Sequence, residues 1–553
     1  MPWAPAIANS IWMAANLPAY ARFRRALGHP ARAQQGLLRD YVRRNASTAF
    51  GRDHGFGSIE TYEDFARQVP LRDYDSLEPW LARVRQGEPD VLACGRPARL
   101  VPTSGSSSAR KLIPFTTRLQ AEFNAAIGPW LVDLARQVPG ILAGPAYWSI
   151  TPAMDFEAAA KSEAAERENG GRLEVGFDSD AAYLGGVRGR LVESILAVPA
   201  SVQHAGSIEA FRYATLLCLL RCRELRLISV WHPSFLSLLL NELPRRWDDL
   251  LKDIALGTCK SSEEFPKESS FRRAFPSMPD RARELGKANP LEAESLWPRL
   301  AVISCWADGP SAGAAAELKR RFPGTMMQPK GLLATETFVS FPFASHRPLA
   351  INSHFFEFLD GAGRVGLAED LGVGHEYEVV VTTGGGLWRY RLGDRVRVDG
   401  LVEKTPSLTF IGRGGNVSDL FGEKLSEMFV AEVLGELAGE PWPGFVLLAP
   451  DEDAEGWRYT LFIEGHHPEA LAQRLDQALA RNPQYAWCRK LGQLLPARVF
   501  RVSGGGYEVF ARRLAADGAR LGDIKPALLS KKGGWRERFA GSYAEPVKVL
   551  QPF

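Results

Sequence analysis

Short apolar runs and helix-like segments alternate in the middle of this chain, and this alternation limits its fold more than any other feature. The spacing of apolar residues predicts helices over 211–220 and 233–243, with a buried strand over 225–230 between them. A second continuous apolar strand is expected over 299–306, and a helix follows over about 311–321. Buried strands that alternate with helices are typical of a sheet covered by helices. The expected fold class is therefore α/β.

The later segments divide the chain into a large and a small domain. Before residue 412 the following strands are expected: 326–334, 354–359, 377–383, 388–391 and 408–411. The pattern changes near 412–415, and beyond it the chain is expected to form a small α+β unit. Its expected elements are helices over 426–438 and 468–481 and strands over 444–448, 459–464, 498–502 and 507–510. We expect an N-terminal domain over residues 1–412 and a C-terminal cap over residues 413–553.

Composition and charge exclude several classes of protein. Lys and Arg number 67 and Asp and Glu number 64, giving a net charge of +3 without a concentrated basic stripe, so we expect no nucleic-acid partner. The longest apolar run, 213–220, is too short to cross a bilayer, and the N-terminus lacks the basic start of a secretory signal. Six cysteines without CxxC spacing indicate a reducing compartment. We expect a cytoplasmic monomer that contacts no membrane.

A Gly/Ser-rich segment, Pro-Thr-Ser-Gly-Ser-Ser-Ser-Ala-Arg-Lys, occupies residues 102–111. Small residues let backbone N–H groups approach an anion closely, the hydroxyls add donors, and the final Arg-Lys pair adds positive charge. The spacing from glycine to lysine differs from that of the P-loop of nucleoside triphosphatases. The segment is a candidate phosphate-binding loop, and a flexible Ser-rich linker is the alternative. Its candidate binding residues are Thr103, Ser104, Gly105, Ser106, Ser107 and Lys111.

An Ala-Thr-Glu motif lies at the end of the expected strand 326–334. The hydroxyl of Thr335 can contact a phosphate or a carboxylate, and the carboxylate of Glu336 can hold a metal ion or position an amine. The alternative is an exposed acidic strand end.

A third motif, Thr-Thr-Gly-Gly-Gly-Leu-Trp-Arg-Tyr-Arg-Leu-Gly-Asp, occupies residues 382–394. The triple glycine permits a close approach of the backbone. Alternation through Leu387, Arg389 and Arg391 predicts a half-buried strand with a basic face, and Asp394 is an acceptor suited to a ribose diol. A hairpin with a salt-bridged edge is the alternative.

Taken in order, these three motifs resemble the signature of the acyl acid amido synthetases. This family belongs to the adenylate-forming enzymes, together with acyl-CoA synthetases and luciferases, and is known from plant auxin-responsive and jasmonate-conjugating enzymes with bacterial relatives, which this chain resembles. Residues 230–236 and 410–413 support the resemblance, which extends from about residue 37 to 549. It implies a large N-terminal adenylate-forming domain with mixed sheets and helices, which binds ATP and the acyl acid, and a small, mobile α+β C-terminal domain.

The resemblance implies that ATP and Mg²⁺ activate a carboxylic acid as an acyl adenylate, which the amine of an amino acid then attacks to form an amide. It places the phosphate loop at 103–111, a contact to the α-phosphate and the acyl carboxylate at Thr335, and a catalytic, metal-binding carboxylate at Glu336. Attack of one anion on another requires charge neutralisation and alignment, so these residue types fit the chemistry.

The same resemblance assigns roles to residues near and within the C-terminal cap. It places the ribose acceptor at Asp394 and a basic residue beside the interdomain hinge at Arg413. Lys424 and Lys525 match two lysines of the mobile C-terminal domain and are the candidate catalytic lysines. A lysine on a movable domain can stabilise the adenylation transition state and then withdraw.

Two other functions remain open. An acid–thiol ligase would pass the same adenylate to coenzyme A or a carrier thiol, and the acceptor used after adenylation distinguishes it. A nucleotide-binding protein without turnover is the other, although the joint presence of Lys111, Glu336, Asp394 and Lys525 favours an enzyme. Two remaining features point to no ligand by themselves: residues 504–506, a triple glycine expected in a tight hairpin, and His232, expected either near the acyl group or in buried packing.

Overall fold

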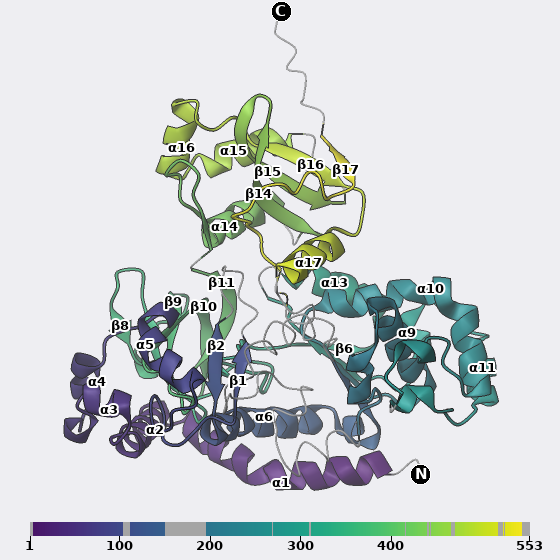
Figure 1. The fold of residues 1–553 in the computed structure, drawn as a ribbon, viewed down its shortest axis with the longest axis horizontal. Coiled ribbons are helices and arrows are strands. Elements are labelled where there is room, and N and C mark those ends of the chain that lie inside the picture. Colours follow the sequence, from purple (N-terminus) through teal and green to yellow (C-terminus); the bar gives the residue numbers. More distant parts are fainter. Residues whose placement is uncertain are drawn as a thin grey trace, which may run out of the picture.

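The structure is a computed structural model. It describes residues 4–102, 111–149, 195–267, 269–308, 311–414, 416–438, 442, 444–465, 470–517, 524 and 526–544. Figure 1 shows a broad N-terminal body (residues 4–414) and a smaller C-terminal body (residues 416–544) above it. Helices α1 (Ala4–Leu27) and α6 (Thr117–Gln137) pack against each other along the base of the N-terminal body.

A four-stranded parallel sheet forms one half of the N-terminal body. Its strands lie side by side in chain order: β3 (Ala146–Trp148), β4 (Leu227–Ser229), β5 (Val302–Cys305) and β6 (Met326–Pro329). Successive side chains of a strand point to opposite faces, so Ile228 and Leu227 enter different cores. One face packs on α9 (Ile208–Arg221), α10 (Pro233–Leu256) and α13 (Ala312–Arg321), and the other on α1 and α6. This arrangement confirms the predicted α/β class.

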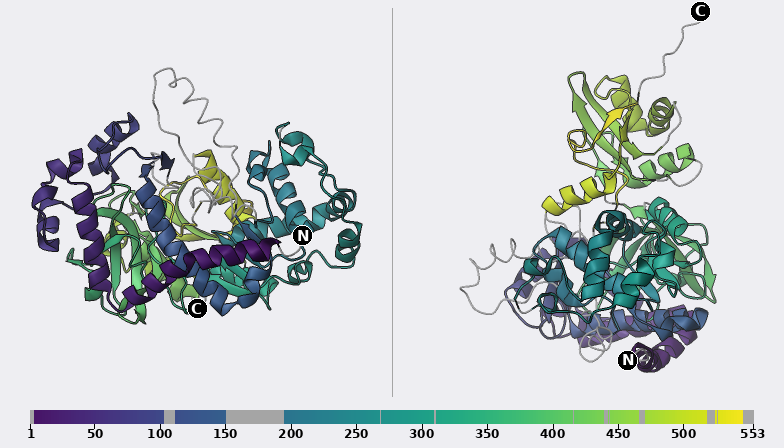
Figure 2. Two further views of the ribbon diagram at one scale, coloured as in Figure 1. Left: turned by 90° about the horizontal axis from the view of Figure 1, so that it is seen from below. Right: turned by 90° about the vertical axis from the view of Figure 1, so that its right-hand side faces the viewer.

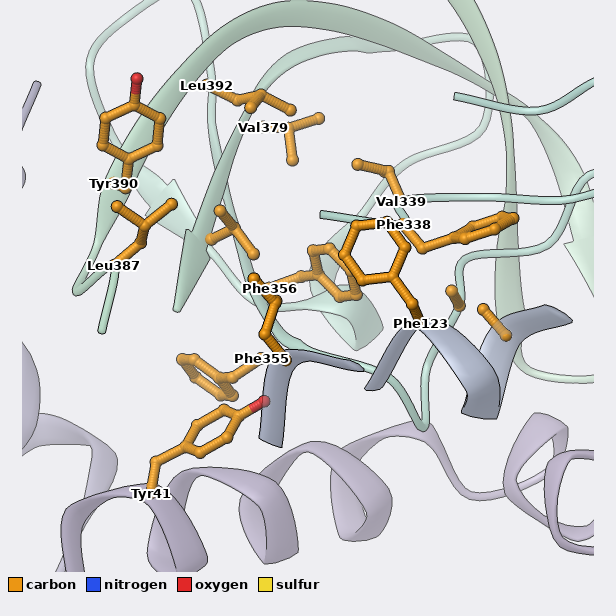
Figure 3. Packing of buried hydrophobic residues seen from close by; sticks show 14 of the residues in the cluster. Tyr41, Phe123, Phe338, Val339, Phe355, Phe356, Val379, Leu387, Tyr390 and Leu392 are labelled. Carbon is orange, nitrogen blue, oxygen red and sulfur yellow. The ribbon is translucent and has the colours of Figure 1, made fainter. Parts of the chain in front are cut away.

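A five-stranded antiparallel sheet with the order β11-β10-β9-β7-β8 forms the other half. Its strands are β7 (Phe355–Leu359), β8 (Val365–Gly366), β9 (Glu376–Thr382), β10 (Tyr390–Val402) and β11 (Thr405–Arg413). The sheet shares one apolar cluster with α6 and with α2 (Pro30–Arg44). Figure 3 shows Tyr41, Phe123, Phe338 and Phe356 meeting in this cluster from four separate segments. Helix α6 therefore supports both sheets.

The remaining elements of the N-terminal body are short. A two-stranded antiparallel hairpin is formed by β1 (Arg99–Pro102) and β2 (Leu112–Phe115). Within the described ranges the other helices are α3 (Ala49–Asp53), α4 (Tyr62–Gln68), α5 (Tyr74–Arg85), α11 (Pro279–Leu285), α12 (Ala293–Leu296), and the 3-10 turns η1 (Phe56–Ser58), η2 (Pro139–Ala143), η4 (Ala200–His204), η5 (Ser262–Glu264), η6 (Ser270–Arg272) and η8 (Ala368–Asp370). Each helix within the described ranges is too short or too polar to cross a membrane.

The C-terminal body contains a four-stranded mixed sheet with the order β14-β15-β16-β17. Its elements are β12 (Val417–Ser418), β13 (Leu425–Ser426), α14 (Glu427–Ala438), β14 (Val446–Asp453), β15 (Gly456–Glu464), α15 (Leu471–Leu479), α16 (Pro483–Lys490), β16 (Arg498–Val502), α17 (Gly506–Ala516) and β17 (Gly541–Tyr543). Strands β15 and β16 run parallel because α15 and α16 connect them. Helices α14 and α15 cover one face of the sheet, and α17 covers the other.

The start of α17 differs from the sequence-based expectation. The alternation at residues 507–510 predicts a strand, but these residues form the first turns of a helix. Gly505 takes a left-handed φ of 69°, and its carbonyl accepts a hydrogen bond of 3.0 Å from the N–H of Val509. Buried Gly506 and Phe510, four residues apart, then lie on one face of the helix, as helical spacing requires. The triple glycine at 504–506 therefore begins a helix and does not form the predicted hairpin.

Helix α10 continues past Pro244 to residue 256, whereas the predicted helix ends at residue 243, directly before this proline. A proline removes one backbone donor and normally ends a helical pattern. Here Leu243 before the proline and Leu250 and Ile254 after it are buried on the same face against the parallel sheet. Tertiary packing of the apolar stripe thus outweighs the loss of one hydrogen bond.

Candidate active site

The hairpin of β1 and β2 holds both ends of the Ser-rich segment. Pro102 pairs with Leu112 across the two strands, while residues 103–107 lie outside the described residues. Lys111, the last residue of the segment, is half-buried, and its Nζ donates to the hydroxyl of Tyr390 at 3.5 Å. The same ammonium lies 5.6 Å from the centre of the Tyr74 ring. Lys111 is therefore held beside the start of β10, the strand that carries Asp394.

Thr335 and Glu336 form the tip of a tight hairpin. The expected strand 326–334 is shorter than predicted, since β6 ends at Pro329. Ala334 and Thr337 exchange backbone hydrogen bonds of 3.0 and 3.3 Å, which leaves Thr335 and Glu336 as a two-residue loop. Thr335 is half-buried and Glu336 is 3% exposed, so the alternative of an exposed acidic strand end is wrong.

This hairpin leaves the parallel sheet at its carboxyl edge, where ligands of open α/β sheets bind. A close backbone approach sets its position: a Cβ on Gly331 would lie 2.1 Å from the carbonyl oxygen of Ser340. The N–H of Leu332 also donates to the Ser340 hydroxyl at 3.0 Å. Only a glycine at 331 lets the two arms of the hairpin lie this close.

Asp394 lies at an irregularity of the antiparallel sheet. The register between β10 and β9 shifts between Arg391 and Arg395, and Gly393 has a left-handed φ of 78°. Such bulges re-aim a side chain. Asp394 is fully buried and pairs in register with Arg413 of β11, whose side chain lies outside the described residues. The bulge therefore brings the predicted ribose acceptor and the predicted basic residue opposite each other.

The triple glycine at 384–386 faces the protein itself. The N–H of Gly384 donates to both carboxylate oxygens of Glu122 at 3.1 and 2.9 Å. A Cβ at this position would lie 2.2 Å from Cγ of Arg118 on α6. Gly386 has a left-handed φ of 92°, and a Cβ there would lie 2.6 Å from Leu92. The glycines therefore allow the turn to pack closely on α6 and on the chain at Leu92.

The basic face predicted through Leu387, Arg389 and Arg391 is wrong. Arg389 is 5% exposed and its guanidinium donates to Glu357 at 2.7 and 3.0 Å. Arg391 is exposed and pairs with Glu378 at 2.7 Å. Arg389 is paired with a carboxylate of β7 and Arg391 with one of β9, as in the salt-bridged alternative.

A buried network that the sequence did not reveal supports both turns. His354 accepts a hydrogen bond from the N–H of Phe338 at Nε2 (3.1 Å), so Nδ1 carries the proton that it donates to Glu122 at 3.0 Å. Glu122 also accepts from Tyr41 at 2.7 Å. Burial, followed by the charge of Glu122, raises the pKa of Tyr41 well above its ordinary value. Glu122 therefore connects the Thr335–Glu336 hairpin, by way of Phe338, to the glycine turn.

One signal could have indicated this network. Glu122 lies on α6 between Leu119, Phe123 and Ala126, so the helix carries a carboxylate within its apolar stripe. A carboxylate buried at 3% exposure needs partners that satisfy it. Those partners are 81, 232 and 262 residues away in the chain, and this distance hides them from sequence analysis.

An aromatic group with one lysine lies at the carboxyl edge of the parallel sheet. Lys330, which follows β6, donates to the hydroxyl of Ser229 at 2.8 Å. Its ammonium lies 5.2 Å from the ring centres of both Trp130 and Trp231. Trp231 in turn lies 5.7 Å from Trp306, centre to centre. Lys330 is five residues before Thr335, so this surface adjoins the hairpin.

The C-terminal lysines are placed differently from these residues. Lys424 is exposed and has a left-handed φ of 45°. The preceding Glu423 is buried and accepts from Leu420 and Phe421 at 2.8 Å each, so the loop is fixed while Lys424 points to solvent. Lys525 lies outside the described residues, between Ile524 and Pro526.

Comparison with known proteins identifies the family. Residues 19–327 match the GH3 family N-terminal domain, residues 348–413 the GH3 family central domain and residues 428–533 the GH3 family C-terminal domain. Indole-3-acetic acid-amido synthetase GH3.15 of Arabidopsis thaliana is 26% identical over 419 residues, which cover 69% of this chain and 67% of that protein. Probable indole-3-acetic acid-amido synthetase GH3.4 of Oryza sativa subsp. japonica is 26% identical over 591 aligned positions, covering 96% and 92%.

The fold is shared with a solved structure. GH3.15 acyl acid amido synthetase matches with a TM-score of 0.76 at 20% identity, over 96% of this chain and 98% of that chain. A complex of AtGH3.15 acyl acid amido synthetase with 2,4-DB gives the same TM-score at 18% identity, over 97% and 98%. The resemblance inferred from the three motifs is confirmed. Because the N-terminal domain match alone spans more than half of its length, the chain belongs to the GH3 family.

Proposed function

We propose that this chain is an ATP-dependent ligase that activates a carboxylic acid as an acyl adenylate and joins it to the amine of an amino acid. The GH3 family assignment and the amido synthetase names of its relatives support this enzyme class. One structural observation carries the proposal: the segments of all three motifs belong to or adjoin one apolar cluster, which contains Phe338, Leu387 and Tyr390. The hairpin tip, the bulge and Lys111 can therefore act on one bound nucleotide.

The proposed roles follow the positions of the side chains. Residues 103–107 and Lys111 bind the phosphates of ATP, since the hairpin that carries them brings Lys111 to Tyr390. Thr335 contacts the α-phosphate and the acyl carboxylate. Asp394 and Arg413, opposite each other on β10 and β11, bind the nucleoside part of ATP. We assign residues 1–412 to binding of ATP and acyl acid, and residues 413–553, with Lys424 and Lys525, to the cap.

Two steps make up the reaction. In the first, a carboxylate oxygen of the acid attacks the α-phosphorus, a new P–O bond forms and pyrophosphate leaves. In the second, the neutral amine attacks the acyl carbon, the amide bond forms and AMP leaves. The amine must lose a proton, and Glu336, buried at the tip of its hairpin, can accept a hydrogen bond from it. Lys525 and Lys424 supply positive charge during the first step.

The residues present fit a magnesium ion that arrives with ATP. Magnesium is usually bound by one or two carboxylates together with phosphate oxygens and water. Glu336 would be its protein ligand, and the described residues contain no group of three or more His, Cys, Asp or Glu that could hold a metal alone. The ion supplies neutralisation of phosphate charge.

The acyl group is proposed to lie against Trp130, Trp231 and Trp306, next to the hairpin. Large rings offer extensive apolar contact to a flat acid. The relatives named for indole-3-acetic acid and the complex with 2,4-DB support aromatic acids as the first substrates to test. We also propose a cytoplasmic location, which the six free cysteines, all within the described residues, support. The monomeric state remains a proposal that light scattering can test.

The deciding experiment is acid-dependent exchange between ATP and labelled pyrophosphate over a panel of aromatic and aliphatic acids. Active acids are then incubated with ATP and each amino acid, and in parallel with coenzyme A. We expect exchange with at least one acid and an amide product. A thioester in place of the amide would identify an acid–thiol ligase. Nucleotide binding without exchange for any acid would identify a protein that lacks turnover.

A further inference from the structure

Two features without a role in the site, His232 and the triple glycine at 504–506, meet where the two bodies touch. Helix α17 lies on the side of the C-terminal body that faces the N-terminal body (Figures 1 and 2). Its second residue, Tyr507, stacks on His232 with ring centres 4.8 Å apart and an angle of 18° between the planes. This stack joins α17 to the start of α10.

His232 is fixed within the N-terminal body. It precedes α10, and its Nδ1 accepts the N–H of Ser234 at 3.2 Å and lies 2.5 Å from the Ser234 hydroxyl. Burial lowers the pKa of His232 to about 3, so the ring is neutral at working pH. His232 also follows β4 at the carboxyl edge of the parallel sheet, the same edge from which the Thr335–Glu336 hairpin leaves after β6.

Tyr507 is fixed within the C-terminal body. Its hydroxyl donates to the carbonyl of Ile524 at 3.0 Å, and burial raises its pKa, so the hydroxyl keeps the proton that it donates. The turn before it is equally constrained, because the N–H of Gly506 donates to Glu464 at 2.5 Å and a Cβ there would lie 2.6 Å from Phe445. Tyr507 therefore connects His232 to the main chain at Ile524, the residue that precedes Lys525.

An ion pair accompanies the stack. Glu508, the next residue of α17, lies 3.2 Å from Arg212 of α9. Arg212 also lies 3.8 Å from Glu242 of α10, and its side chain is only 13% exposed. Two adjacent residues of α17 thus contact the N-terminal body through a ring and a charge, which fixes both position and orientation.

We propose that Tyr507 is a positioning residue for adenylation: it holds the main chain at Ile524 against the N-terminal body through His232. The proposal rests on the proposed function, in which the neighbouring Lys525 serves the first half-reaction only. Misplacing a contributing group by about 1 Å can lower a rate about a hundredfold. Loss of the stack should then slow adenylation while sparing the attack of the amine.

The test compares Tyr507→Leu, Tyr507→Phe and His232→Phe with the wild type in two assays. One is acid-dependent pyrophosphate exchange, and the other is amide formation from a chemically prepared acyl adenylate. We expect Tyr507→Leu to lower exchange about ten- to a hundredfold and amide formation less than about threefold. Tyr507→Phe keeps the ring but loses the link to Ile524, and His232→Phe keeps the stack, so both should be milder.

Tyr543→Phe is the matched control. Tyr543 also donates its hydroxyl within the C-terminal body, to Asp451 at 2.6 Å, but its ring packs on Phe500 of β16, with ring centres 5.3 Å apart. It should retain wild-type exchange. Thermal unfolding of each variant shows whether it folds. If Tyr507→Leu does not, the double variant Glu508→Gln with Tyr507→Phe removes the ion pair to Arg212 and the link to Ile524 while it keeps the ring.

Three results would overturn the proposal, and they differ from failure of the proposed function. Equal losses in both assays would make Tyr507 a structural residue. Wild-type exchange in a folded Tyr507→Leu protein would show that the stack has no positioning role, while the ligase assignment stands. Absence of exchange in the wild type with every acid would remove the proposed function and the positioning role with it.

Discussion

The two bodies hold their candidate residues in different ways. In the N-terminal body Glu336 and Asp394 are buried, and each is carried by a turn or bulge that packs on a shared core. In the C-terminal body Lys424 is exposed, and Tyr507 is half-buried at a contact between the bodies. The fold of the N-terminal body positions the first group, whereas the second group depends on the position of the C-terminal body relative to the N-terminal body.

This difference predicts two kinds of variant. Changes at residues positioned by the core should alter nucleotide binding or both half-reactions, because the same geometry is present throughout. Changes at residues that depend on the C-terminal body should separate the half-reactions, since a movable group contributes only in the step for which it is placed. The predictions below test this separation.

The largest expected effect is at Lys525. Lys525→Ala should lower acid-dependent pyrophosphate exchange roughly a hundred- to a thousandfold, as loss of one preorganised charge contact typically does. ATP binding measured by calorimetry should change much less, because the contact forms mainly in the transition state. Lys532→Ala is the control, since Lys532 is exposed and pairs with Asp517 at 3.0 Å. Equal loss in exchange and in amide formation from prepared adenylate would contradict a role limited to adenylation.

Glu336→Gln should lower the rates of both half-reactions, in contrast to Lys525→Ala, which should lower adenylation alone. The variant keeps the shape of a side chain that is 3% exposed but removes its charge. Loss of charge-assisted contacts to metal or amine should lower both exchange and amide formation, each about ten- to a hundredfold. Glu63→Gln, at an exposed position of α4, should retain both activities. If only one half-reaction fell, Glu336 would belong with the residues that act in a single step.

Asp394→Ala should act mainly on nucleotide binding. Loss of a hydrogen bond to a carboxylate costs about 1.5–3 kcal/mol, so the ATP Michaelis constant should rise about ten- to a hundredfold. Asp399→Ala is a matched control on the same strand, where Asp399 is exposed and accepts from Thr409 at 2.6 Å. Unchanged ATP dependence in folded Asp394→Ala protein would remove Asp394 from the site.

Local signals predicted much of the fold correctly. The helix expected over 211–220 is α9, residues 208–221, because its run of apolar residues and its N-capping Ser207 are both local signals. The prediction of a strand at 507–510 was wrong because four residues are too few to distinguish the period of a strand from that of a helix. The left-handed Gly505 precedes a helix here. Strand β10 was expected to end at 391, since the bulge at Gly393 interrupts the alternation that resumes at Val396.

The sequence predicted which residues belong to the candidate site, but it did not predict the contacts that hold them in place. The motif residues Thr335, Glu336 and Asp394 follow from sequence, and their roles remain proposals. The network around Glu122 and the stack of Tyr507 on His232 join residues that are far apart in the chain, and no local pattern records such pairs. The triple glycine at 384–386 indicated a close approach of the backbone, and only the fold revealed that its partners are α6 and the chain at Leu92.

The smallest effect on activity is expected at Gly384, and it tests whether the core positions the site. A methyl group there would lie 2.4 Å from a carboxylate oxygen of Glu122 and 2.2 Å from Arg118. Such overpacking costs about 1–3 kcal/mol, so Gly384→Ala should lower the free energy of unfolding by that amount and the melting temperature by a few degrees. Gly361→Ala is the control, since nothing lies within 4 Å of a Cβ at that exposed position.

The activity of Gly384→Ala then shows whether Glu122 and its hydrogen-bond partners stay in place or move. If Glu122 moves to accept the methyl group, its bonds to His354 and to the N–H of residue 384 shift together, and the Thr335–Glu336 hairpin moves through Phe338. At 25 °C we expect exchange and amide formation to fall equally, by less than about tenfold, because both steps use this hairpin. A loss confined to exchange would show that the glycine turn serves adenylation alone. The N-terminal body would then hold single-step residues too, and the contrast between the two bodies would fail.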